Sequence, residues 1–288
     1  MQGWLIVNGF LQSNKFDELY AFLSRAAERE GMHLQCKTSC ELFGVLEGGF
    51  ALYERPDFVL FWDKDYPLAK RLEAAGIPVF NTAEGMRLAD DKRLTALALQ
   101  GRVKTPKTMI APTTFEGVGY SALGFLRAAE KELGFPMILK EAFGSFGQQV
   151  YLVSEMAQLQ ALVCQLGYKP FLLQEYIAES KGKDVRINVV GDEVFCAILR
   201  QNPNDFRSNI SGGGTAEPYQ PTPAQERAAI AACKALGLEF AGVDLLFGRD
   251  GEPLICEVNS NPHFKSTFDC TGLDMSAAIL RRIKERLQ

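Results

Sequence analysis

Residues 240–263 read FAGVDLLFGRDGEPLICEVNSNPH. Two apolar runs, 242–247 and 253–258, flank a turn that contains Asp250 and Gly251. An Asp-Gly pair between two apolar runs is a strong local signal for a β-hairpin. The stretch therefore predicts two antiparallel strands joined by a short loop.

Three polar side chains, Asp244, Glu257 and Asn259, interrupt the apolar strands of this hairpin. A loop centred on the Asp-Gly pair sets Asp244 directly opposite Glu257, and strand alternation puts Asn259 on the same face. A loop shifted by one residue would put the two acids on opposite faces. Opposed carboxylates, roughly 4.5–5.5 Å apart at Cβ, repel each other unless a cation lies between them. Because Mg²⁺ prefers oxygen ligands, the hairpin predicts a magnesium site, with an ordinary polar spot as the alternative.

The composition is that of a folded globular protein. The chain has 288 residues, of which 47% are hydrophobic, and its 31 basic and 35 acidic residues give a net charge of −4. This length suits two or three structural units, and the charge gives no signature of nucleic-acid binding. The start, MQGWLIVNGF, does not resemble a signal peptide, and no apolar run is long enough to span a membrane. We therefore expect a cytoplasmic protein with no nucleic-acid or membrane partner.

The seven cysteines are scattered along the sequence and form no CxxC pair. In a reducing compartment we expect them to be small buried apolar residues. Cys36 and Cys40 lie near His33, but a fourth ligand at usable spacing is missing, so a zinc site is not predicted.

Residues 1–89 alternate short apolar runs with helical patterns, which implies a small parallel α/β unit. Strands are predicted at 4–7, 34–36, 58–61 and 78–80, and helices at 16–30 and 66–75. The first strand is not followed by the GxGxxG sequence of dinucleotide-binding folds, which argues against a nicotinamide dehydrogenase. The unit is expected to carry part of a substrate pocket.

From residue 90 the pattern predicts a helix at 90–100 and then an α+β unit. Its expected strands are 107–110, 137–141, 150–153 and 171–177, and its expected helices are 122–133 and 155–166. Lys140 lies in the apolar run MILK and needs an anion at its tip. The loop FGSFGQQ follows, and its glycines allow the backbone to approach a phosphate, although a plain hairpin loop is the alternative.

Polar and apolar residues alternate at 183–190, so that Asp184, Arg186 and Asn188 share one face of a strand. A partner strand is expected at 195–200. The segment DFRSNISGGG then places Arg207 before three glycines, which suits a loop that closes over an anionic substrate, with a disordered surface loop as the alternative. Helices are expected at 223–237 and 276–287.

Six motifs in order, LKEAFGSFGQQV, QEYI, KDVRINVVGDEV, DFRSN, AGVDLL and EVNSNP, resemble those of the ATP-grasp superfamily. They are most similar to its RimK-type carboxylate–amine ligases, which include the alpha-L-glutamate ligases. The resemblance implies a mixed α/β and α+β fold of three units. These would be an N-terminal parallel α/β domain at 1–89, a central lid at 90–175 and a C-terminal antiparallel-sheet domain with the metal site at 176–288.

The resemblance also implies roles for individual residues. Nucleotide contacts would come from Lys92, Lys140, Ser145, Gly147, Glu175, Tyr176, Ile177, Asp184 and Ser208. Arg186, Arg207 and Asn209 would face the phosphate or the reacting carboxylate. Asp244, Glu257 and Asn259 would hold Mg²⁺, with Mn²⁺ as an alternative ion, which agrees with the hairpin argument above. A solvated surface charge is the alternative for Lys92.

The implied activity is an ATP- and Mg²⁺-dependent ligase that joins an amine, foremost an amino acid, to a carboxylate through an acyl phosphate. Substrates would be small carboxylates and amines, or a peptide or protein terminus, and homo-oligomers are compatible with this activity. The alternatives are a thiol acceptor or phosphorylated product on the same fold, and a nucleotide-binding regulator without turnover. Residues 261–266, NPHFKS, depart from the pattern of the glutamate-adding ribosomal-protein modifiers, which leaves the amine acceptor open.

Overall fold

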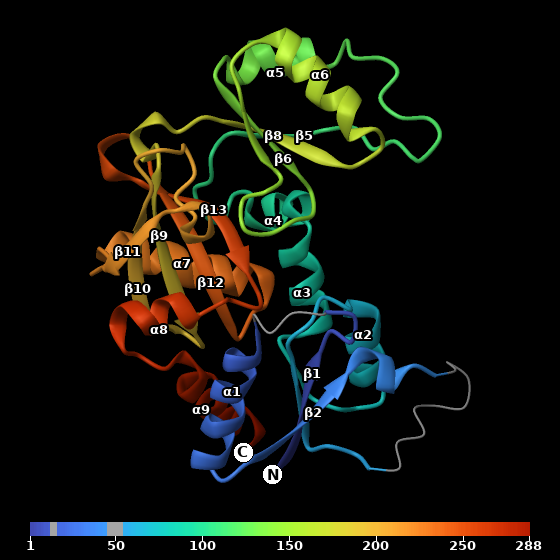
Figure 1. Cartoon of the computed structure of the whole chain (residues 1–288), viewed down its shortest axis with the longest axis vertical. Coiled ribbons are helices and arrows are strands. Elements are labelled where there is room, and N and C mark those ends of the chain that lie inside the picture. The colour runs from blue at the N-terminus through green and yellow to red at the C-terminus, as the bar shows by residue number, and fades with distance from the viewer. Residues whose placement is uncertain (12–15, 45–53) are drawn as a thin grey trace.

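The computed structural model describes residues 1–11, 16–44 and 54–288. Three sheets follow one another along the chain and form the N-terminal unit, the lid at the top of Figure 1 and the C-terminal unit. The first sheet is parallel and the other two are antiparallel, which confirms the predicted fold class. In the part of the chain that the structure describes, no helix is both long and apolar enough to cross a membrane.

The N-terminal sheet has the strand order β2-β1-β3-β4. Its strands are β1 (Gln2–Val7), β2 (His33–Thr38), β3 (Phe58–Phe61) and β4 (Val79–Phe80), with helices α1 (Asp17–Arg29), α2 (Tyr66–Ala74) and α3 (Ala83–Asp90). The central strands are buried on both faces, as is typical of a parallel sheet covered by helices. Asn8 follows β1 and Asp63 lies two residues after β3, so both lie at the carboxyl edge of the sheet.

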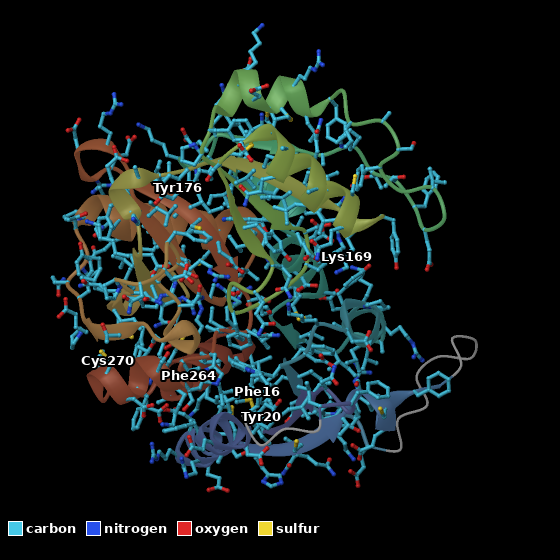
Figure 2. The ribbon with its side chains drawn as sticks, turned by 45° about the horizontal axis from the view of Figure 1, so that its top comes forward. Phe16, Tyr20, Lys169, Tyr176, Phe264 and Cys270 are labelled. Atoms are coloured by element: carbon cyan, nitrogen blue, oxygen red, sulfur yellow. The ribbon has the colours of Figure 1, made fainter. Side chains whose placement is uncertain are left out.

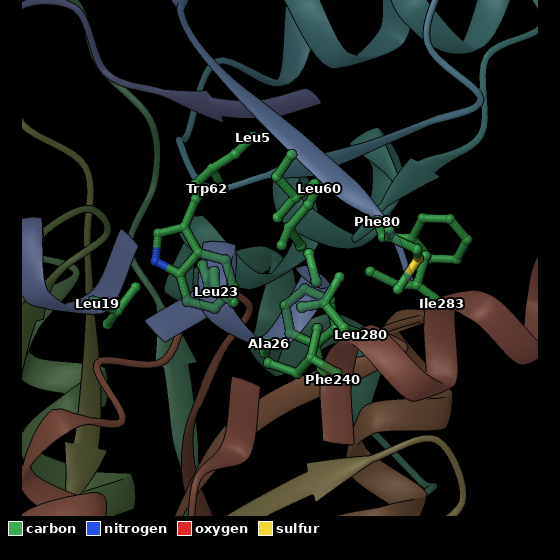
Figure 3. Packing of buried hydrophobic residues seen from close by; sticks show 14 of the residues in the cluster. Leu5, Leu19, Leu23, Ala26, Leu60, Trp62, Phe80, Phe240, Leu280 and Ile283 are labelled. Carbon is green, nitrogen blue, oxygen red and sulfur yellow. The ribbon is translucent and has the colours of Figure 1, made fainter. Parts of the chain in front are cut away.

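The C-terminal helix α9 (Met275–Leu287) returns to the N-terminal unit and packs beside α1 (Figure 1). Figure 3 shows the core between them, where Leu23, Trp62 and Leu280 meet Phe240 from the C-terminal sheet. The Trp62 and Phe240 rings stack with their centroids 5.6 Å apart. One apolar core therefore joins residues from both ends of the chain.

Asn81 fixes the N-terminal unit to the C-terminal sheet. Its fully buried amide donates to the carbonyl oxygens of Phe240 and Ser260, both at 2.9 Å, and accepts from the Glu239 amide at 2.7 Å. Because breaking these bonds would leave buried polar groups unpaired, the two units are held in a defined orientation.

The lid sheet has the order β5-β8-β6-β7 and is covered on one face by two helices. Its elements are β5 (Thr108–Ile110), β6 (Met137–Glu141), β7 (Val150–Val153), β8 (Phe171–Glu175), α5 (Leu126–Leu133) and α6 (Met156–Leu166). Met137 and Leu139 pack under the helices, whereas Ile138 and Lys140 line the cleft on the other face. The alternation along β6 thus separates the core of the lid from the site.

The C-terminal sheet has the order β11-β10-β9-β12-β13. It consists of β9 (Lys183–Val190), β10 (Glu193–Gln201), β11 (Thr215–Pro218), β12 (Phe240–Phe247) and β13 (Pro253–Asn259), with α7 (Pro223–Leu236) against it and α8 (Lys265–Thr271) beside β10 and β11. Val185, Ile187 and Val189 belong to its core, as their alternation predicted. The polar residues between them face the cleft or the cover formed by α8.

Several predictions of local structure need correction. The helix expected at 90–100 is instead α4 (Lys92–Leu99), because Asp91 is extended and caps it by accepting from the Arg93 amide at 2.9 Å. Helix α5 begins at Leu126, later than predicted, and α3, β11 and α8 were not predicted. Cys36, Cys40 and Cys164 are exposed, contrary to expectation; for Cys36 the reason is its position on the edge strand β2.

The hairpin of β12 and β13 pairs Asp244 with Glu257, as predicted, but for a different reason. Next to the loop, Phe247 pairs with Pro253, which is one residue out of the predicted register. A β-bulge at Cys256 restores the alignment farther along the strands, because it inserts one extra residue into β13. Without the bulge the two acids would point to opposite faces of the sheet.

Candidate active site

A cleft of about 420 Å³ lies between the open face of the lid sheet and the polar face of the C-terminal sheet. All but one of the predicted site residues line it: Lys140, Ser145, Gly147, Glu175, Tyr176, Ile177, Asp184, Arg186, Arg207, Ser208, Asn209, Asp244, Glu257 and Asn259. The exception, Lys92, lines a small adjacent cavity together with Lys140 and Glu257. These residues come from five strands, β6, β8, β9, β12 and β13, from three loop segments and from helix α4.

Lys140 is a buried cation in the wall of the cleft. Its side chain extends from β6 with an exposed fraction of only 7%, and Nζ lies 3.3 Å from Sγ of Cys256. Burial raises the pKa of the Cys256 thiol despite the adjacent lysine, so the thiol is a neutral partner. None of the residues that the structure describes places a carboxylate in ion-pair contact with Nζ of Lys140. An anionic ligand would complete this environment.

Lys92 connects the lid loop to the hairpin of β12 and β13. Its Nζ donates to the carbonyl oxygen of Gly144 at 3.0 Å and lies 3.8 Å from Oε1 of Glu257. Its backbone amide donates to the Ala142 carbonyl at 3.0 Å. Lys92 is mostly buried, with 12% of its side chain exposed, so the alternative of a solvated surface charge is wrong.

The lid loop also contacts the segment that carries Arg207. Nη1 of Arg207 donates to the Gly147 carbonyl at 2.8 Å, and the same guanidinium binds Asp205. Gly147 has φ of 73°, and a Cβ added there would lie 2.4 Å from Oδ1 of Asn209. Only glycine satisfies both conditions, so this position lets the loop rest directly on residues 207–209.

Four charged side chains form an alternating network on the floor of the cleft, which we call the floor network: Asp184, Arg200, Asp244 and Arg186. Arg200 donates to both carboxylate oxygens of Asp184, at 2.7 and 2.6 Å, and its Nη2 lies 3.0 Å from Oδ1 of Asp244. Arg186 binds Asp244 through Nε and through Nη2, the latter at 2.7 Å from Oδ2. Each buried acid is thus paired with at least one arginine.

The floor network shifts the pKa values of two of its members, Asp244 and Arg200. Burial opposes the ionisation of Asp244, but the charges and hydrogen bonds of Arg186 and Arg200 outweigh it, so the pKa of Asp244 is lowered. Burial likewise opposes the charge of Arg200, whereas Asp244 and Asp184 raise its pKa. Asp244 and Arg200 are therefore both charged at neutral pH.

Arg200 was not predicted from the sequence. A two-residue turn at Gly191 and Asp192 would set Arg200 opposite Lys183. The observed strands contain a bulge at Phe195, and Arg200 pairs with Asp184 instead. An arginine at the end of the predicted strand 195–200 could have been recognised as a candidate site residue. Its partner could not, because the pairing with Asp184 depends on this bulge.

The donor set of Asp244, Glu257 and Asn259 fits a hard divalent cation. All three supply oxygen atoms, which a hard cation prefers. Among the described residues, no further His, Cys, Asp or Glu joins Asp244 and Glu257 to form a group of three such ligands. Glu257 has 32% of its side chain exposed, whereas Asp244 is buried and would share its oxygens with the arginines. Asn259 donates its amide to the Gly242 carbonyl at 3.2 Å, which leaves the acceptor half of the amide for a cation.

The hinge between the lid and the C-terminal unit forms one end of the cleft. Oε1 of Glu175 accepts from the Lys107 amide at 2.7 Å, so this carboxylate supports strand β5 and a ligand would meet backbone groups here. Tyr176 marks this end in Figure 2, and burial raises the pKa of its phenol. Ile138, Ile177 and Leu246 provide apolar surface beside it.

The opposite end of the cleft, which we call the substrate end, is formed by Phe16, which the sequence did not indicate, and by residues of the segment 261–266 that the sequence placed near the substrate pocket. Phe16, Asn261, His263 and Ser266 line it. Figure 2 shows Phe16 beside Tyr20 and far from Tyr176, and the rings of Phe16 and His263 meet edge to face at 5.7 Å. The N-terminal unit therefore contributes to the cleft through a residue more than 200 positions before the hairpin.

A lid sheet and an antiparallel sheet that enclose a cleft with buried lysine, arginine and carboxylate groups are the features of an ATP-grasp enzyme. The model of the RimK-like ATP-grasp domain matches residues 89–283. The chain therefore belongs to the RimK-like ATP-grasp family and is an ATP-grasp ligase.

Individual relatives agree with this assignment. A probable alpha-L-glutamate ligase of Stutzerimonas stutzeri is 32% identical over 280 residues, which cover 93% of this chain and 85% of the relative. A RimK domain ATP-grasp protein of Sphaerobacter thermophilus superposes with a TM-score of 0.73 at 21% identity, over 98% of this chain and 99% of the other. The D-alanine–D-alanine ligase of Bacillus anthracis, solved in complex with ATP, gives a TM-score of 0.74 at 20% identity, over 100% and 97%.

Proposed function

We propose that this protein uses ATP and Mg²⁺ to join a carboxylate to an amine, most simply an amino acid, through an acyl phosphate. The observation that carries this proposal is Lys140, a buried cation in the cleft whose nearest polar partner is a neutral thiol. A nucleotide phosphate is the anion that the family would place there. The name of the Stutzerimonas relative, a glutamate ligase, supports an amino-acid substrate.

The chemistry explains why these residue types are needed. A carboxylate in water does not react with an amine, so a carboxylate oxygen first attacks the γ-phosphorus of ATP, and the bond to ADP breaks. The amine then attacks the acyl carbon, phosphate leaves with the bonding electrons, and the nitrogen loses a proton. In phosphoryl transfer the protein mainly positions the reactants and stabilises negative charge.

The residues divide these tasks by position. Lys140 and Lys92 would bind phosphates beneath the lid loop, where Ser145 and Gly147 cover them. Asp184 would face the ribose, and the hinge backbone at Glu175, Tyr176 and Ile177 would face the base.

Arg186 and Arg207, with Ser208 and Asn209, would face the transferred phosphoryl group or the reacting carboxylate. Asp244, Glu257 and Asn259 would hold Mg²⁺, which supplies positive charge to the phosphoryl oxygens when bound. The contact of Arg207 with Gly147 would exclude water from the acyl phosphate.

The test is ADP release measured over a panel of amino acids and small carboxylates. Stimulation by a specific pair, together with trapping of the acyl phosphate as a hydroxamate, is the expected result. The variant Lys140→Met should abolish the signal, whereas Lys169→Met, which removes an exposed lysine of the same lid unit, should retain it. ATP binding without any stimulated ADP release would instead indicate a regulator, and ADP release without hydroxamate would indicate a phosphorylated product.

A further inference from the structure

At the substrate end, two buried acceptor atoms lack a donor. Oδ2 of Asp63 and Oδ1 of Asn261 are shielded from solvent and accept no hydrogen bond from the described residues, and we call them the acceptor pair. The Asp63 side chain belongs to a residue with an exposed fraction of only 7%, and Asn261 lines the cleft. An unpaired buried carboxylate oxygen costs far more free energy than an unpaired surface group.

The bonds around the acceptor pair fix both atoms in place. Oδ1 of Asp63 accepts from Nδ2 of Asn8 at 3.1 Å and from the Lys64 amide at 2.7 Å, so only Oδ2 remains. Nδ2 of Asn261 donates to the Asp63 backbone carbonyl at 2.9 Å, which uses the donor half of that amide and leaves its oxygen. The two residues are therefore in contact, and both free atoms are acceptors.

The neighbouring cations that the structure describes do not supply the missing donor. Lys64 pairs with Asp90, and Nζ of Lys265 lies 2.7 Å from Oδ2 of Asp269. Burial, together with the charges of Cys36 and Asp63, raises the pKa of Tyr20 to about 12, which indicates that Asp63 makes this region negative. A ligand that carries positive charge and several N–H donors matches the environment.

The acceptor pair lies close to the residues that we propose hold Mg²⁺. Asn261 lines the cleft two residues beyond Asn259, which is one of the proposed Mg²⁺ ligands. Asp63 lies behind Asn261, which contacts it, and at the carboxyl edge of the parallel sheet. Ligands of open α/β sheets bind outside this edge. The rings of Phe16 and His263 provide an apolar wall beside it.

We propose that Asp63 and Asn261 bind a protonated primary amino group of the substrate. The proposal rests on the ligase function and specifies one of its substrate classes: a compound with a free ammonium group, as in an unmodified amino acid. An ammonium ion donates to the two oxygens and neutralises the Asp63 charge. An N-acylated compound offers one uncharged donor and therefore leaves the carboxylate uncompensated.

Equilibrium binding tests this proposal separately from catalysis. The full-length protein with ADP and Mg²⁺ is titrated with each standard amino acid and with its Nα-acetyl form, and saturation-transfer NMR detects binding. At least one free amino acid should bind, and its Nα-acetyl form should bind about 10- to 100-fold more weakly. For lysine, the Nε-acetyl form is included, so that an α-amino group and a side-chain amino group are distinguished.

Variants identify the residues responsible. Asp63→Asn should weaken binding of the free amino acid about 10- to 100-fold without changing ADP affinity. The matched control is Asp57→Asn, which alters an exposed aspartate just before the same strand β3. If Asp63→Asn does not fold, Asn261→Ala removes the other acceptor from a partly exposed residue and should weaken binding about fivefold.

Three results would overturn the inference: equal binding of free and acetylated forms, unchanged binding by both variants, or no binding of any amino acid to the wild-type protein. Binding that follows the expected pattern without any ADP release would refute the ligase function and leave the ammonium site in place. The two proposals can therefore fail independently.

Discussion

The floor network lines the cleft, and the acceptor pair meets the same cleft through Asn261, but their buried polar atoms differ in how they are partnered. In the floor network, Asp184 and Asp244 receive hydrogen bonds from Arg200 and Arg186. In the acceptor pair, Oδ2 of Asp63 and Oδ1 of Asn261 receive none from the described residues. The floor network is complete without a ligand, whereas the acceptor pair needs a donor from outside. A buried polar atom without a partner in the protein therefore indicates where a ligand binds, whereas a fully paired buried charge does not.

Removing the central arginine should break the floor network and give the largest effect. Arg200→Met leaves Asp184 and Asp244 buried with one cation fewer, which should lower the free energy of unfolding by roughly 3–5 kcal/mol. Urea denaturation measures this change. Arg249→Met, which alters an exposed arginine in the hairpin loop, should change stability by less than about 0.5 kcal/mol. A loss below about 1 kcal/mol for Arg200→Met would show that the network adds little to stability.

Glu257 provides a third case for the comparison of paired and unpaired acids, because it lines the cleft and none of the described arginines binds it. Its contact within the described chain is Lys92 at 3.8 Å, so we expect its charge to serve a ligand. Glu257→Gln should lower kcat on the order of 10²–10³-fold while the melting temperature stays unchanged. Glu252→Gln, on the loop end of the same hairpin, is the control and should retain activity. Full activity of Glu257→Gln would remove the metal assignment.

Lys92 tests whether the lid loop depends on the charges below it. Lys92→Met removes the bond to the Gly144 carbonyl and the contact with Glu257, so KM for ATP should rise about tenfold. Lys64→Met removes an exposed lysine that pairs with Asp90 and should leave KM unchanged. Steady-state ADP release at varied ATP measures both. Equal KM values for the two variants would exclude a role for Lys92 in nucleotide binding.

Protonation of Asp244 in acid should lower the free energy of unfolding, and we expect this effect to be the smallest of the four. The pKa of Asp244 is lowered by Arg186 and Arg200 from its ordinary value of 3.8. Its ionisation therefore adds stability that is fully present above about pH 4 and is lost as pH falls through the lower folded-state pKa. For one proton the loss is at most about 1.4 kcal/mol per pH unit. Thermal unfolding between pH 5 and pH 2.5 should show a shallower decline for Asp244→Asn than for the wild type.

Much of the fold could be predicted from local patterns. Strands such as β3 and β6 begin and end where their apolar runs do, and the alternation at 183–190 separated the core face from the polar face. Helix α3 was missed although Thr82 caps it by accepting from the Gly85 amide at 3.1 Å, a start signal that was readable. Strand β11 and helix α8 have only four and seven residues, too few to show a clear period.

The sequence by itself determined most of the elements, the hairpin that carries Asp244 and Glu257, and the residue types that gather in the cleft, because each depends on periodicity and spacing within a short stretch. Only the tertiary structure decided that Arg200 pairs with Asp184 and that Glu257 faces Asp244, since both depend on a bulge that shifts the register by one residue. It also brought Asp63 to Asn261 across 198 positions, a contact that no local pattern encodes. Strand pairing and long-range packing select such partners, and they act between segments that are distant in sequence.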